Sequence, residues 1–85
     1  MPRVLLVDDG KICDVFEVLE LSGTLVKARS PFLFEIGEEL RVRIEDDGKV
    51  SDATAHVRAH VGGPDDKVTE LELSGRGEPR PMVSG

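Results

Sequence analysis

The chain has 85 residues, with 17 acidic and 11 basic side chains and a formal net charge of −6. This length allows one domain with a modest core, and the negative charge argues against binding to a nucleic acid polymer, which needs a broad positive surface. No apolar run reaches the roughly 20 residues of a membrane span. Because the first residues do not read as a signal peptide, we expect no membrane insertion and a cytoplasmic protein.

The first predicted element is a β-hairpin. Residues 3–7 form a short apolar run, and Asp8-Asp9-Gly10-Lys11 follows it. An Asp-Gly pair between apolar runs favours a type I′ turn, because both central residues of that turn have positive φ. The return strand is predicted over residues 12–21, with a bend near Cys13. That residue is the sole cysteine, which excludes an intramolecular disulfide.

The second hairpin leads into an apolar loop. Ser22-Gly23 separates the return strand from a strand expected over residues 24–28. Ser30-Pro31 ends that strand, since proline cannot donate to a ladder. The following Phe32-Leu33-Phe34 carries more apolar surface than a connection needs, and such patches mark contact sites. We predict these three residues as an interaction surface; a plug for one end of a barrel is the alternative.

Three later strands follow from alternation of apolar and polar residues. Leu40, Val42 and Ile44 alternate with charged side chains, which is the period of a strand with one wet face. A second Asp-Asp-Gly-Lys at residues 46–49 repeats the turn chemistry of the first hairpin. Alternation over 53–61 and 69–73 predicts two more strands. Residues 75–85 hold glycine and proline without periodicity, so we expect a flexible tail after a domain spanning 1–74.

Polar residues on these strands suggest contacts rather than catalysis. His56, Arg58 and His60 are predicted to form one outward stripe, with Arg58 paired to the acidic face of the next strand. The two histidines would lie about 13 Å apart, too far to share a metal ion. Carboxylates gather at turns, and neither the serines nor Cys13 have a nucleophile-elbow context. We therefore expect no enzyme, no catalytic residue and no metal site.

Three segments, Val18 to Val26, Phe34 to Ile44 and Ala55 to Arg58, together resemble a PilZ domain. PilZ domains are six-stranded antiparallel barrels that bind cyclic diguanylate in bacteria. The resemblance implies an all-β fold, a six-stranded antiparallel PilZ-like β-barrel with a disordered C-terminal tail. It also implies weak ligand-binding positions at Glu20, Ser22 and Arg58.

The ligand motif departs from the family pattern. Glu20 stands where Asp or Asn is usual, Ser22 matches, and Leu25 replaces the usual glycine. The upstream pair of arginines that holds the ligand is missing, and no other side chain supplies the same bidentate and stacking contacts. The resemblance therefore implies a degenerate cyclic diguanylate site and no required cofactor.

These patterns predict a bacterial regulatory or signalling module that acts through protein contacts. One alternative is a genuine cyclic diguanylate receptor, with the arginine supplied by Arg29, Arg41, Arg43 or Arg58. The other alternative is a structural homo-oligomeric β subunit. The expected partner is a second copy of the chain in a homodimer. Pairing would use residues 3–7 and 69–73, which are predicted to be edge strands.

Overall fold

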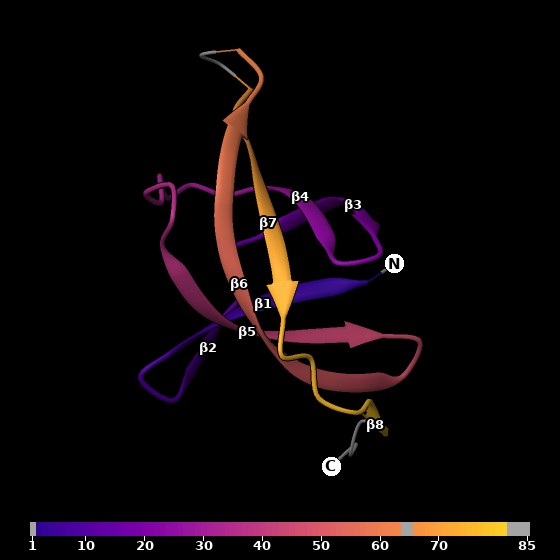
Figure 1. Cartoon of the computed structure of the whole chain (residues 1–85). Helices are drawn as coiled ribbons and strands as arrows, with labels where there is room; N and C mark the ends of the chain where they lie inside the picture. The colour runs from indigo at the N-terminus through magenta and orange to yellow at the C-terminus, as the bar shows by residue number, and fades with distance from the viewer. Residues whose placement is uncertain (1, 64–65, 82–85) are drawn as a thin grey trace.

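A computed structural model describes residues 2–63 and 66–81 as strands joined by turns and loops (Figure 1). Those residues contain no helix, and hence none that is long and apolar enough to cross a membrane. The strands are β1 (Arg3–Asp8), β2 (Lys11–Cys13), β3 (Glu17–Ser22), β4 (Leu25–Arg29), β5 (Glu39–Asp46), β6 (Lys49–Val61), β7 (Val68–Ser74) and β8 (Arg80–Pro81).

All eight strands belong to one antiparallel sheet in the order β2-β1-β5-β6-β7-β4-β3, with β8 paired to β6. The all-β antiparallel prediction is confirmed. Two finer predictions are wrong, because the described residues form a sheet of eight strands rather than six, and this sheet is not closed into a barrel. Strand β3 contacts β1 as the sheet curls (Figure 1), but no ladder between them occurs among the described residues.

The reason for the open sheet lies in the segment Asp14 to Phe16. The predicted return strand over 12–21 breaks there, so β2 pairs with β1 while β3 pairs with β4. Two strands that follow each other in sequence therefore end at opposite edges of the sheet. The bend predicted near Cys13 is confirmed.

Both Asp-Gly turns have the predicted geometry. Asp9 and Gly10 have φ of 51° and 79°, and Asp47 and Gly48 have φ of 53° and 72°. Positive φ at both central residues is the signature of a type I′ turn, which matches the twist of the strands it joins. The β1–β2 and β5–β6 hairpins are therefore set by local sequence.

The core lies on the inner face of the curled sheet and is built almost wholly from aliphatic side chains. Phe16, from the β2–β3 connection, is its one buried aromatic ring at 6% exposure. Packed against it are the buried side chains Val4, Val26, Ala28, Leu40, Val42, Ile44, Ala53, Ala55, Val57, Leu71 and Leu73.

A β-bulge in β6 changes which residues face the core. Val57 pairs with Leu71, whereas Ala59 pairs with Glu70, so Arg58 is an extra residue in the ladder. Such an insertion moves every later side chain to the opposite face. His60 consequently pairs with the buried Thr69, on the core side. The predicted single stripe of His56, Arg58 and His60 is therefore wrong.

The edge strands also differ from the prediction. β1 lies between β2 and β5, and β7 lies between β6 and β4, so both are interior strands. The strand order ends at β2, which has three residues, and at β3, which has six. Strand β3 has a bulge between Val18 and Glu20 and carries Glu17 and Glu20, features that discourage edge-to-edge pairing.

The chain after β7 returns to the sheet. Residues 75–81 run along the start of β6, where Lys49 pairs with Pro81 and Val50 with Arg80. The boundary predicted at residue 74 coincides with the end of β7, but the segment after it contacts the sheet. The last part of the predicted flexible tail, residues 82–85, lies outside the described residues.

Candidate interaction surface

The backbone of the loop between β4 and β5, residues 30–38, is hydrogen-bonded to the sheet. The N–H of Gly37 donates to the carbonyl of Val57 at 2.8 Å, and the N–H of Val57 donates to the carbonyl of Glu38 at 2.9 Å. Within the loop, the N–H of Glu35 donates to the side chain of Glu38 at 3.1 Å. Gly37 has φ of +93°, which an L side chain rarely adopts, so the turn depends on glycine there.

His60 holds the middle of the same loop through a hydrogen bond. Its Nε2 lies 2.6 Å from the carbonyl oxygen of Phe34, and its Nδ1 lies 3.2 Å from Oγ1 of Thr69. Because a carbonyl oxygen can only accept, Nε2 carries the proton and donates to Phe34. The bulge at Arg58 makes this contact possible, since without it His60 would face outward.

The three phenylalanines form a short stack that divides the loop into an anchored part and an exposed part. The ring of Phe34 lies 5.7 Å from that of Phe16 and 6.2 Å from that of Phe32, measured between centroids. Phe34 is partly buried against the core. Tilted rings at these distances attract each other beyond simple burial. Phe34 therefore anchors the loop, as the plug alternative predicted for the whole segment.

Three other apolar side chains of the loop point into solvent. Phe32 is 55% exposed, Leu33 67% and Ile36 66%. We call these three residues the apolar loop patch. Of the three residues that sequence analysis predicted as the interaction surface, Phe32 and Leu33 are exposed and Phe34 is partly buried. Ile36 is a further exposed apolar side chain of the loop. Ile36 lies directly before Gly37 in a tight turn, and this position in the sequence was the signal that its side chain does not reach the core.

An open cleft of about 690 Å³ lies beside the patch, with Phe32 in its wall. Its apolar lining includes Val15, Phe16 and Pro31. Arg29 at its rim donates through Nε to Oδ1 of Asp66 at 2.7 Å. This hydrogen bond, reinforced by the charge of Asp66, raises the pKa of Arg29 above its ordinary value.

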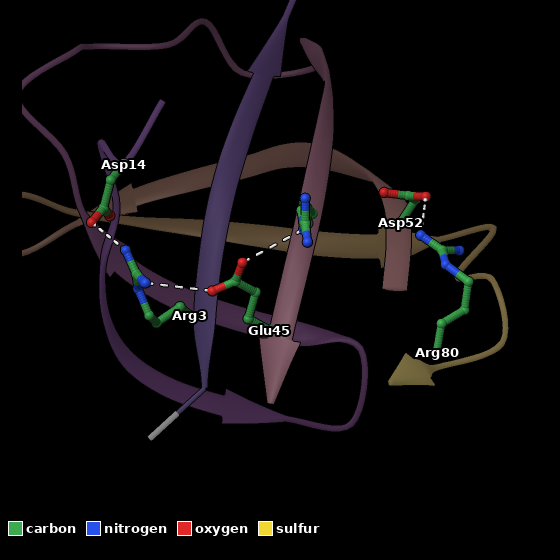
Figure 2. A network of polar contacts seen from close by, with 6 residues as sticks. Arg3, Asp14, Glu45, Asp52 and Arg80 are labelled. Atoms are coloured by element: carbon green, nitrogen blue, oxygen red, sulfur yellow. Dashed lines mark hydrogen bonds and ion pairs between the residues drawn. The ribbon is translucent and has the colours of Figure 1, made fainter. Parts of the chain in front are cut away.

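The β2–β3 connection that supplies one wall of this cleft is held by charge contacts (Figure 2). Nη2 of Arg3 lies 2.6 Å from Oδ2 of Asp14, and Nη1 of the same residue lies 3.4 Å from Oε1 of Glu45. Arg3 thus joins this connection to β5 as well as to its own strand β1. Both sides of the cleft, the β4–β5 loop and the β2–β3 connection, are therefore held in place by hydrogen bonds or ion pairs.

The residues predicted to bind cyclic diguanylate are not brought together. Glu20 and Ser22 lie on β3, whereas Arg58 lies on β6, with β4 and β7 between them. Three strand spacings of about 4.8 Å separate β3 from β6 by roughly 14 Å along the sheet. Arg58 pairs with Glu72 at 3.3 Å, which agrees with the predicted use of the acidic face, and Glu20 contacts Lys27 at 3.7 Å.

The remaining candidate residues are the two histidines, the acidic side chains and the cysteine. Residues 2–63 and 66–81 contain no group of three or more His, Cys, Asp or Glu side chains placed to hold a metal ion. His56 contacts Ser74 on the outer face at 3.0 Å, away from His60. Cys13 is half-buried at the end of β2 and has no disulfide partner.

Searches with protein-family models, of curated proteins and of solved structures found no match to this chain.

Proposed function

We propose that this chain is a small interaction module that binds a second copy of itself through the apolar loop patch. The observation that carries the proposal is the contrast within one loop. Phe32, Leu33 and Ile36 are more than half exposed, while the backbone beneath them is fastened to Val57 and His60. Contiguous exposed apolar groups mark contact sites, and a loop that is already ordered loses little entropy on binding.

The size of the patch fits a weak homodimer. Side chains of this size and exposure leave on the order of 100 Å² each in water, or about 300 Å² per copy. At ~25 cal/mol per Å² the gross gain is about 7 kcal/mol per copy. Association costs about 4–15 kcal/mol, which consumes a third to all of the gain from two copies, so the patch supports at most a weak dimer.

A regulatory role in bacterial signalling is part of the same proposal, and its support is the resemblance of the three segments to PilZ domains. A cyclic diguanylate receptor has less support. Of the four arginines that were candidates for a ligand site, three have carboxylate partners: Arg29 with Asp66, Arg43 with Glu45 and Arg58 with Glu72. We expect calorimetry with cyclic diguanylate to give no saturable heat. Tight binding that Arg58→Ala abolishes would refute this part.

Sedimentation velocity tests the dimer. The patch variant carries Phe32→Ser, Leu33→Ser and Ile36→Ser, and a control variant carries Ile12→Ser and Leu19→Ser. Ile12 and Leu19 are 51% and 41% exposed but lie on β2 and β3, outside the patch. We expect the wild type and the control to dimerise at high micromolar concentration and the patch variant to stay a folded monomer. A monomeric wild type would overturn the proposal.

A further inference from the structure

The start of β6 extends beyond the end of β7. β6 runs over Lys49–Val61, but its ladder with β7 begins only at the Thr54–Ser74 pair. Residues 49–53, which we call the β6 overhang, have β5 on one side and no β7 on the other. An unpaired strand edge offers backbone N–H and C=O groups to any extended segment of suitable chemistry.

In the structure the C-terminal segment, residues 76–81, covers this edge. The N–H of Gly77 donates to the carbonyl of Asp52 at 2.9 Å, and Nε of Arg76 donates to Oγ of Ser51 at 3.0 Å. Nη2 of Arg80 lies 3.2 Å from Oδ2 of Asp52, as Figure 2 shows. The β6 overhang is therefore covered by an extended backbone of the same chain that carries two arginines.

The C-terminal segment covers the overhang but is itself exposed and held by few contacts. With the segment in place, Val50 and Ser51 of the overhang are only 5% and 1% exposed. The ladder of β8 spans only Arg80–Pro81, and the prolines at 79 and 81 have no N–H to donate. The Arg80–Asp52 pair is exposed, and such pairs contribute little.

We propose that the β6 overhang is a strand-addition site for an extended, arginine-bearing segment of a partner protein, and that residues 76–81 occupy it as an internal competitor. The seated segment shows the chemistry that fits, a main chain in strand conformation with a guanidinium near Asp52. The acidic residues of the adjoining turn, Asp46 and Asp47, and the net charge of −6 also favour a basic partner. This site goes beyond the dimer proposed above, because the apolar loop patch attaches near Val57, farther along β6.

The full-length chain provides a matched pair of variants for the test. Gly77→Pro with Arg80→Ala removes the N–H donor to Asp52 and the guanidinium, which releases the segment and leaves β6 unchanged. Gly77→Ala is the control, since an added Cβ would meet nothing nearer than the Asp52 carbonyl oxygen at 3.9 Å. The probe is a synthetic peptide of residues 75–81 with Pro79→Val and Pro81→Val, which restores both N–H donors.

Titration is followed by nuclear magnetic resonance of the labelled chain. We expect the released chain to bind the peptide about tenfold more tightly than the wild type or the control, because the internal competitor is gone. Shifts should concentrate at residues 49–53 and spare the apolar loop patch. Asp52→Asn in the released chain should weaken binding severalfold. Should Gly77→Pro disturb folding, Arg76→Ala with Arg80→Ala releases the segment without proline.

Three outcomes of the peptide titration would overturn the proposal. They are equal affinity of the wild-type and released chains, absence of peptide binding to either, and shifts centred outside residues 49–53. A released chain that loses self-association would assign the segment to a second copy of the chain and would also overturn it. None of these outcomes depends on the patch variant, so failure of this proposal and failure of the dimer are distinguishable.

Discussion

Substitution of Phe34 by alanine should destabilise the fold far more than substitution of its neighbour Phe32. Complete removal of a buried Phe side chain costs about 3–5 kcal/mol, and Phe34 is partly buried against the core. Half of that cost, together with the lost ring contacts to Phe16 and Phe32, gives about 2–3 kcal/mol. Phe32 is 55% exposed and has one ring contact, so its loss should cost at most about 1 kcal/mol.

Urea denaturation followed by circular dichroism suits this chain, because it has no Trp or Tyr for fluorescence. In thermal unfolding of a domain of this size, followed by the same signal, a loss of 2–3 kcal/mol lowers Tm by roughly 10–20 °C. Measurements at low micromolar concentration keep dimer formation from contributing to stability. Equal losses for Phe34→Ala and Phe32→Ala would refute the division of the loop into an anchor and an exposed patch.

Three further substitutions, with Gly63→Ala as a control, test the local features that set the fold. His60→Leu should cost about 1–3 kcal/mol in urea denaturation, because it leaves the Phe34 carbonyl without its donor; no loss would mean that the histidine does not hold the loop. Gly48→Ala should cost about 1 kcal/mol, since Gly48 has φ of +72°, whereas Gly63→Ala, with open space around it, should change stability by less than ~0.5 kcal/mol. Arg58→Ala should cost under ~1 kcal/mol, because its pair with Glu72 is exposed, and a larger loss would show that the bulge depends on this side chain.

Local sequence predicted the turns and most strands. Each Asp-Gly pair needed positive φ at two residues, and few other conformations satisfy that pattern between apolar runs. Strict alternation from Leu40 to Ile44 had one reasonable interpretation, a strand with one buried face. These signals are local, and the structure agrees with them.

The sheet order was not predictable from the same signals, because pairing between distant strands leaves no local pattern. Residues 3–7 and 69–73 were predicted as edges from their places near the chain ends, yet β1 and β7 are interior strands. The bulge at Arg58 was hidden because Ala59 and Val61 continue the apparent alternation past it. Consequently the role of His60 in holding the loop could not be foreseen.

The exposure of the predicted interaction surface was foreseeable only in part, for a similar reason. Composition alone shows that the loop is too apolar to be only a connection, but not which side chain turns inward. Phe34 does so because the Phe16 ring lies beneath it, and Phe16 arrives from the β2–β3 connection. The remaining side chains, with Ile36, are left outside.

The most direct test of the central claim is a search for intermolecular contacts in mixed dimers of labelled and unlabelled chains. Isotope-filtered nuclear Overhauser spectra at high micromolar concentration report protons of one copy that lie near the other. The account predicts contacts from Phe32, Leu33 and Ile36, and their loss on dilution. A wild-type dimer whose contacts instead come from Leu19 on the β3 edge would contradict it.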